Sequence, residues 1–193
     1  MRQHNSTIGS AGETSNTKEL RAAMRSFQDA QWGIKDAFEA LALAQAKYPQ
    51  IDRKRVYVAG HSSAATLSLQ IASSTNHVSG CVAFAPVCDL EQRLGSKTMT
   101  LLDAWVPGTA VSLKAASPGS RVDGFKCPMF LFHALDDDNV SPASVIAFKN
   151  QLVRKGVKVE YVSAPSGGHY DSMLNQGIPA AIRWLKQVDA GIK

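Results

Sequence analysis

The sequence predicts an α/β fold, with a mainly parallel sheet of about four strands and helices on both faces. Short, continuously apolar segments, which are typical of strands buried on both faces, alternate along the chain with segments of helical spacing. The composition agrees with this class, because 45% hydrophobic and 19% charged residues are ordinary proportions for a soluble globular protein. A length of 193 residues suits one domain, so we expect residues 1–193 to fold as a single unit.

The N-terminal part of the chain is polar at first and then helical. Residues 1–16 are rich in Ser, Thr and Asn and lack the apolar segment of a secretory signal, so we expect them to be poorly ordered. A helical pattern starts at Thr17 and breaks or bends over residues 26–33. It resumes with apolar side chains at helical spacing from Ile34, and we expect Pro49 to end it.

The predicted strands are three continuous apolar segments and one alternating segment. The continuous segments span residues 55–60, 80–85 and 128–133. Residues 157–162 alternate mostly between apolar and polar side chains, which is typical of a half-exposed edge strand.

Three further helices are expected between and after these strands. Residues 63–73 are rich in Ala, Leu and Ser. Residues 142–155 follow a Ser in the N-cap position, begin with Pro and end before a Gly. A final helix is expected over residues 178–188, with Ile182 and Leu185 facing the core.

The segment 88–126 is long for a connection within an α/β domain. It contains a short apolar stretch at residues 101–106 and is otherwise rich in Gly, Ser and Pro. Long connections in such domains often cover a functional site. Two interpretations are open at this point: a partly helical, lid-like insertion that contacts the substrate, and a segment that only fills space by packing.

The net charge of +5 does not by itself indicate a nucleic-acid partner. The 21 Lys and Arg residues are scattered, and the densest groups, at 53–55 and 154–155, are not interleaved with aromatic residues that could stack on bases. No apolar run approaches the roughly 20 residues that a membrane-spanning helix needs. We therefore expect neither a nucleic-acid partner nor a membrane span within this chain.

The three cysteines, Cys81, Cys88 and Cys127, are too few for a disulfide framework, and none of them has the C-x-x-C spacing of a zinc site. Cys81 lies in an apolar segment, which favours a buried free thiol and hence a reducing compartment. A cytoplasmic location is the corresponding expectation.

The pentapeptide Gly-His-Ser-Ser-Ala at residues 60–64 stands where the first predicted strand ends and a helix begins. A serine in such a turn projects its hydroxyl above the strand ends, and the N–H groups that follow it face a reacting carbonyl. The usual pattern is G-x-S-x-G, and here Ala64 replaces the second glycine. The same residues are compatible with a simple turn of small side chains, so Ser62 alone does not establish chemistry.

Two later loops carry an acid and a base. Residues 136–138 are three consecutive aspartates after the third strand, and His169 follows two glycines after the edge strand. In a parallel sheet both loops emerge at the same edge as Ser62. Taken singly, the aspartates could complement a helix dipole and the glycines could form a turn. Taken together, in these loops and this order, they predict a catalytic triad of Ser62, Asp137 and His169.

From about Asp36 to the C-terminal helix, the chain resembles the α/β-hydrolase superfamily, in the branch of prolyl oligopeptidase catalytic domains and dienelactone-hydrolase-like proteins. The matching pieces are Ile51-Asp52 and Arg55, Gly60-His61-Ser62, Ser117-Pro118, Cys127-Pro128, His133 with Asp137 and Val140, and Gly168-His169. The departures are Ala64 and Ala65, where the family prefers glycine, and Ala134 after the strand-end histidine. The resemblance implies a partial α/β-hydrolase fold.

The resemblance also implies roles for individual residues. The family's acid stands four residues after a histidine at the end of a strand, which selects Asp137 rather than Asp136 or Asp138. The other histidines are then expected to be structural: His4, His61, His77 and His133.

The implied activity is that of a serine hydrolase that cleaves a small ester or peptide substrate. His169 would take the proton of Ser62, and Asp137 would orient the imidazole while an acyl-enzyme forms and is hydrolysed. The backbone N–H of Ser63 is the expected oxyanion donor. No metal or organic cofactor is required, and the choice between peptidase and esterase is open.

In this family several strands and an oxyanion loop, often H-G-G, precede the helix that leads to the nucleophile. The chain has no H-G-G in this region and no convincing apolar strand before Thr17. Residues 9–13 only faintly resemble the Gly-rich loop. The strand that leads to Ser62 would then have an unpaired apolar edge, and such edges seek partners. We expect either a fragment of a larger hydrolase or an edge closed by another chain, as in a homo-oligomer. Because a second oxyanion donor has no candidate, a catalytically silent scaffold is the alternative.

Overall fold

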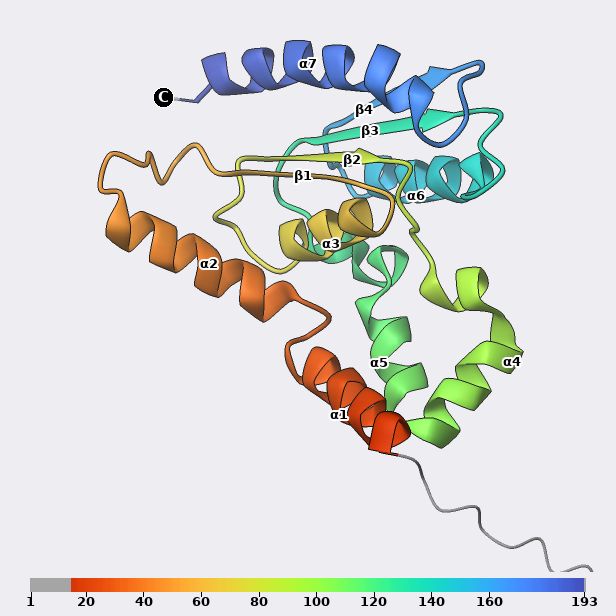
Figure 1. Cartoon of the computed structure of the whole chain (residues 1–193). Helices are drawn as coiled ribbons and strands as arrows, with labels where there is room; N and C mark the ends of the chain where they lie inside the picture. The colour runs from red at the N-terminus through yellow and green to blue at the C-terminus, as the bar shows by residue number, and fades with distance from the viewer. Residues whose placement is uncertain (1–14, 193) are drawn as a thin grey trace, which may run out of the picture.

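Four strands form one parallel sheet in the order β1-β2-β3-β4 (Figure 1). The structure is a computed structural model that describes residues 15–192. The strands are β1 (Tyr57–His61), β2 (Gly80–Phe84), β3 (Met129–Ala134) and β4 (Val159–Ala164). All three pairings are parallel, and β4 lies at one edge of the sheet. The predicted parallel sheet and its half-exposed edge strand are therefore confirmed.

The helices fall close to the predicted segments. They are α1 (Ser15–Asp29), α2 (Ile34–Lys47), α3 (Ser63–Ala72), α4 (Leu90–Trp105), α5 (Thr109–Ala116), the 3-10 segment η1 (Pro118–Gly124), α6 (Pro142–Arg154), the π-helical turn η2 (Met173–Gly177) and α7 (Ile178–Ala190). Residues 1–14 lie outside the described residues, so the expectation of poor order there is not tested. None of the helices within 15–192 combines the length and the apolarity that crossing a bilayer requires.

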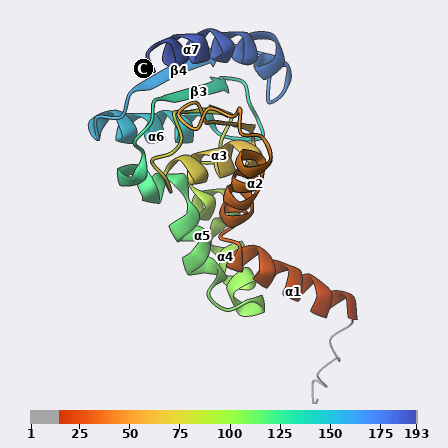
Figure 2. The same cartoon turned by 90° about the vertical axis from the view of Figure 1, so that its left-hand side faces the viewer.

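The sheet is covered by helices on both faces, as predicted. In Figures 1 and 2, α3 and α6 lie against one face, and α7 lies against the other. Successive side chains of a strand point to opposite faces, so each face acquires its own core. On the side of α3 and α6, Cys81, Met129 and Leu131 pack with Leu69 and Val145.

The second core lies between the sheet and α7. Val82, Phe130 and Phe132 point to this side and pack with Ala181 and Trp184 of α7. All three strand residues are at most 1% exposed. Burying side chains of this size stabilises the fold by about 1.5–3 kcal/mol each.

One expectation for α7 is wrong. Leu185 packs on the α7-side core, but Ile182 is 48% exposed. The residues of α7 that pack inward centre on Ala181 and Trp184, and at 100° per residue Ile182 lies at the flank of that stripe. The spacing of apolar residues in the sequence therefore placed the core-facing side of α7 about one residue too far towards the C-terminus.

Strand β1 forms the other edge of the sheet, because within residues 15–192 it pairs with β2 alone. The N–H of Ser62 and the C=O of Val56 bond to the β2 side. Since peptide groups alternate along a strand, those of Tyr57, Ala59 and His61 point away from β2. Ala59 is exposed and no residue of β1 is fully buried, so the expectation of a strand buried on both faces is wrong for β1, because an edge strand has one side uncovered. Whether another segment or a second chain pairs with this edge stays a prediction.

The segment 88–126 is mostly helical and forms α4, α5 and η1. Figure 1 shows α4 and α5 with α1 in a layer that extends away from the sheet. The turn between α1 and α2 contacts this layer through the indole N–H of Trp32, which donates to the Ser112 hydroxyl at 2.8 Å. The helical part of the expectation agrees with the structure, whereas a lid function stays a prediction.

Strand β1 and helix α3 pack closely because Gly60 has no side chain. A Cβ atom at residue 60 would lie 2.3 Å from the carbonyl carbon and oxygen of Ala64, which is much shorter than any real contact. This close approach holds the turn that contains Ser62. The glycine is therefore required by packing, while the methyl group of Ala64 is accommodated.

Replacing Gly60 by Ala should lower the free energy of unfolding by about 1–3 kcal/mol or more, because backbone atoms of α3 must move to admit the methyl group. Urea-induced unfolding followed by circular dichroism measures this change. Gly191→Ala is the matched control, since its Cβ would make only ordinary contacts, at 3.4 Å or more. Equal unfolding midpoints for the two variants would contradict the packing argument.

Candidate active site

Ser62 occupies the strained turn between β1 and α3. Its backbone angles are φ 57° and ψ −121°, a conformation that residues other than glycine rarely adopt. The turn is held on both sides: the Ser62 N–H donates to the carbonyl of Phe84, and the Ser62 carbonyl accepts from the N–H of Thr66. Such strain persists only where the surroundings impose it, and it is concentrated at functional sites.

Helix α3 begins directly after this serine, at Ser63. The N–H groups in the first turn of a helix have no intrahelical acceptor, and they carry the positive end of the helix dipole. The predicted oxyanion donor, the N–H of Ser63, belongs to this first turn. The N–H of Ser63 thus lies next to Ser62, at the positive end of the helix dipole, and its role as an oxyanion donor stays a prediction.

The structure brings Asp137 and His169 into direct contact. Asp137 Oδ2 and His169 Nδ1 are 2.8 Å apart, and His133 Nε2 lies 3.0 Å from the same oxygen. The other oxygen, Oδ1, accepts the backbone N–H groups of Asn139 and Val140 at 2.9 and 3.0 Å. The carboxylate is buried, yet Oδ1 has two backbone donors and Oδ2 contacts the imidazole of His169; the Nε2 of His133 is also 2.9 Å from the carbonyl oxygen of Val140.

These donors determine the charge state of Asp137. Burial by itself would raise the pKa of the carboxyl group. The hydrogen bonds from His169 and from the N–H groups of Val140 and Asn139 outweigh that effect, and the pKa lies below its ordinary value. Asp137 is therefore a carboxylate at neutral pH and can orient the imidazole of His169.

His169 is 8% exposed. Its Nε2 is buried and has no hydrogen-bond partner among the described residues. The Ser62 hydroxyl likewise makes no hydrogen bond within the described part of the chain. Asp137 and His169 are thus in contact, while the predicted hydrogen bond between Ser62 and His169 is not made within the described residues. Such bonds often tighten only when a substrate is bound.

His61 and Asp136 hold the loop that carries His169, and sequence reasoning assigned neither of them to the site. The ring of His61 lies 4.5 Å from that of His169, and its Nε2 is 2.8 Å from the His169 carbonyl oxygen. Burial lowers the pKa of His61. Asp136 accepts the N–H groups of Gly167 and Gly168. In the sequence, the two glycines before His169 were the signal for such contacts. A loop with two glycines is flexible by itself, so side chains from other elements must hold it in one conformation.

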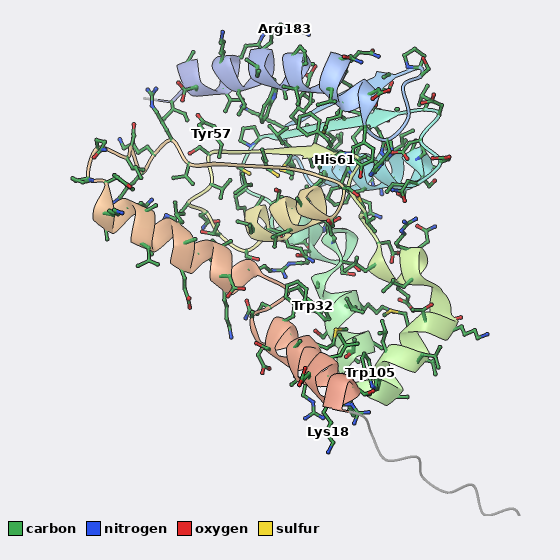
Figure 3. The ribbon with its side chains drawn as sticks, in the orientation of Figure 1. Lys18, Trp32, Tyr57, His61, Trp105 and Arg183 are labelled. Atoms are coloured by element: carbon green, nitrogen blue, oxygen red, sulfur yellow. The ribbon has the colours of Figure 1, made fainter. Side chains whose placement is uncertain are left out.

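A cavity of about 600 Å³ opens beside Ser62. Trp32 is labelled in Figure 3, at the turn between α1 and α2. The lining residues are mainly apolar: Phe27, Trp32, Ser62, Ser63, Ala64, Thr66, Leu67, Gln70, Val87, Leu90, Arg93, Leu113 and Val140. Phe27 and Trp32 meet edge to face, with ring centroids 5.5 Å apart. The cavity can hold an apolar group against the candidate nucleophile.

Arg93 at the rim of this cavity connects α4 with the acid loop. Its guanidinium donates to the backbone carbonyl of Asn139 and, at 2.9 Å, to the side-chain oxygen of the same residue.

A larger hollow, of about 910 Å³, is lined by residues such as Ser79, Pro128 and Lys158. These precede β2, β3 and β4, so that hollow lies at the opposite edge of the sheet and takes no part in this site.

Within residues 15–192, the three cysteines and the potential metal ligands form no second cluster. Cys81, Cys88 and Cys127 are free and buried, and burial raises the pKa of each thiol, to about 11 for Cys127. Among the residues that the structure describes, no three His, Cys, Asp or Glu side chains converge as metal ligands. The candidate chemistry therefore rests on Ser62, Asp137 and His169.

Comparison with known proteins establishes the class and the family. The model of the prolyl oligopeptidase family matches residues 11–188, and the chain belongs to that family. Its fold is that of the α/β-hydrolases. No curated protein sequence shows a significant match to the chain.

Three solved structures illustrate the fold. A Mycobacterium tuberculosis puromycin-hydrolyzing peptidase superposes with a TM-score of 0.68 and 20% identity, over 80% of this chain and 25% of that one. An acylaminoacyl peptidase from Pyrococcus horikoshii gives 0.64 and 17%, over 78% and 26%. An acylaminoacyl peptidase in complex with Z-Gly-Gly-Phe-chloromethyl ketone gives 0.64 and 16%, over 80% and 26%. The chain thus spans about a quarter of the length of these structures.

Burial makes His133 a source of acid sensitivity. The side chain is fully buried, and burial lowers its pKa below the ordinary value of 6.5. Its contribution to stability is therefore complete above pH 6.5 and is lost as the pH falls through the lowered pKa. Between about pH 7.5 and pH 5, the unfolding midpoint in urea should fall less in His133→Gln than in the parent protein.

The glutamine keeps an amide N–H near the position of Nε2 but cannot titrate. His61, whose pKa is also lowered, retains its share of the effect. His77→Gln, at an exposed histidine, serves as the control and should show the full acid-induced fall. If the fall in His133→Gln equals that in the control, buried His133 is not the cause.

Proposed function

We propose that the chain is a serine hydrolase that cleaves an ester or peptide bond through an acyl-enzyme, with peptide bonds favoured by its family. The observation that carries this proposal is the buried contact of 2.8 Å between Asp137 and His169, in the loops that share a sheet edge with the strained Ser62. Membership of the prolyl oligopeptidase family supports a hydrolase. The proposed triad supplies a mechanism for the hydrolysis.

In the proposed mechanism, the free Nε2 of His169 accepts the proton of the Ser62 hydroxyl as Oγ attacks the substrate carbonyl. The imidazolium that forms is stabilised by the carboxylate of Asp137. Collapse of the tetrahedral intermediate then transfers the proton from Nε2 to the leaving amine or alcohol. Water, deprotonated by the same nitrogen, releases the acyl group and restores Ser62.

The N–H of Ser63 supplies one hydrogen bond to the oxyanion of the intermediate. Two donors are usual in this fold, and loss of one typically costs on the order of 10²- to 10³-fold in rate. We therefore expect slow turnover by these residues alone. Reaction of Ser62 with an activated phosphonate is a more sensitive readout than peptide hydrolysis, because it does not require a complete catalytic cycle.

Ser62 should react covalently with a fluorophosphonate probe, and the label should disappear in Ser62→Ala and in His169→Ala. Mass spectrometry of the labelled protein locates the adduct. Ser163→Ala removes an exposed serine of β4 and should label at the parental rate. If the folded protein is not labelled at Ser62, the hydrolase proposal is contradicted and the alternative of a catalytically silent scaffold is favoured.

The cavity beside Ser62 supports a substrate with a large apolar acyl side chain. Phe27, Trp32 and Leu113 form part of its wall, and the wall is extended by Leu67 and Leu90. An apolar group that enters it loses contact with water, which favours binding by roughly 25 cal/mol per Å² of buried apolar area. An acyl residue with an aromatic or branched side chain is accordingly the proposed preference.

Trp32→Ala should reduce this preference, because it removes an aromatic wall and the contact with Ser112. We expect kcat/KM for p-nitrophenyl esters with a phenylalanyl acyl group to fall about tenfold more than that for the acetyl ester. Leu43→Ala is the control, since Leu43 is 72% exposed on α2 and does not line the cavity. Parallel losses for both esters would show that Trp32 does not select the acyl group.

A further inference from the structure

The loop that carries His169 has unusual backbone freedom. Gly167 and Gly168 precede the histidine, and both have positive φ, 112° and 56°. A Cβ on Gly167 would lie 2.9–3.0 Å from atoms of Ser172, so this tight conformation also requires glycine there. Two consecutive glycines lose more conformational entropy on ordering than any other pair of residues. The imidazole of His169 can keep its contact with Asp137 only if residues outside this loop fix the loop's conformation.

Asp136 holds the loop from the side of the acid. One carboxylate oxygen accepts the N–H of Gly167 at 3.0 Å, and the other accepts the N–H of Gly168 at 2.9 Å. Successive N–H groups that point the same way form a binding site for an anion. Because Asp136 adjoins Asp137 in sequence, one loop makes two contacts with the loop of His169: Asp137 contacts the imidazole, and Asp136 accepts the N–H groups of the two glycines before His169.

The other contacts of the loop start from different elements. His61, at the end of β1, contacts the carbonyl oxygen of His169. Ser172, at the start of η2, bonds the carbonyl oxygens of Gly167 and Gly168 through its N–H and its hydroxyl. Asp136 is therefore the anchor that fixes the glycines relative to the acid loop itself.

We propose that Asp136 is a positioning residue: it binds the two glycine N–H groups ahead of His169 and thereby keeps the imidazole in contact with Asp137. This inference rests on the proposed function in so far as His169 is the base. Asp136 does not touch the reacting atoms. It acts through His169, and its effect is on the orientation and the tautomer of that ring.

The adjacent aspartates provide a matched pair of variants. Asp136→Asn replaces the anion by an amide that cannot accept both N–H groups equally well. Asp138→Asn removes the same charge on the other side of Asp137, from an exposed side chain that makes no hydrogen bond or ion pair with the described residues. Any difference between the two variants reflects the contact with the glycines and not the loss of a nearby negative charge.

The decisive measurement is the tautomer of His169, read from two-bond 1H–15N correlations of the imidazole nitrogens at about pH 8.5, where an unperturbed imidazole is neutral. The resonance is assigned by its absence in His169→Ala. The full 193-residue protein and Asp138→Asn should show the proton on Nδ1. Asp136→Asn should show a mixture in which the Nε2–H form is populated. A purely structural anchor would not move the proton.

The rate constant for labelling of Ser62 by the fluorophosphonate probe supplies the second readout. It should fall on the order of tenfold or more in Asp136→Asn, and by less than about twofold in Asp138→Asn, because small displacements of a catalytic base are costly. A tautomer and a labelling rate that are the same in the two variants would overturn the proposal, as would a parent protein without the proton on Nδ1. If the tautomer changes only in Asp136→Asn but no form labels, Asp136 positions His169 and the proposed hydrolase function fails.

Discussion

The strands all run in the same direction, and this constraint brings the three residues of the candidate site to one edge of the sheet. Because the pairings of β1 with β2, β2 with β3 and β3 with β4 are all parallel, the loops after β1, β3 and β4 leave the sheet at one edge. These loops carry Ser62, Asp137 and His169, which are far apart in the sequence. One antiparallel strand among them would send its side chain to the opposite edge, more than a strand length away.

The site concentrates features that oppose folding. Ser62 has a backbone conformation that costs on the order of 1–3 kcal/mol, and Asp137 is a buried charge. Both are tolerated because the surroundings compensate. Gly60 lets α3 lie close enough to impose the turn, and the carboxylate of Asp137 accepts two backbone N–H groups and contacts the imidazole of His169. The contact with Asp137 orients His169, whose buried Nε2 has no hydrogen-bond partner among the described residues.

Much of the fold and of the candidate site could be predicted from local patterns. Continuous apolar segments indicated β2 and β3, since such segments are buried on both faces of a parallel sheet. The predicted alternation of strands and helices also placed Ser62 between a strand and a helix, and Asp137 and His169 in loops after strands. The inner face of α7 was misplaced at Ile182, because a pattern of apolar residues locates a helical stripe only to within a residue. Tertiary contact with β2 and β3 selected Ala181 and Trp184 instead.

What the sequence by itself determined is the order of strands and helices and the residue types in the loops, because these depend on periodicity, glycine and proline over short distances. Only the tertiary structure decided the contacts between distant segments. The two carboxylates of Asp136 and Asp137 look equivalent in sequence. Asp136 accepts two glycine N–H groups of a distant loop, whereas Asp137 contacts the imidazole of His169 and accepts two N–H groups of its own loop. Likewise, Trp32 lies 30 residues before Ser62 and reaches its cavity only because the turn after α1 packs on α5. Such assignments depend on three-dimensional packing, which no local pattern encodes.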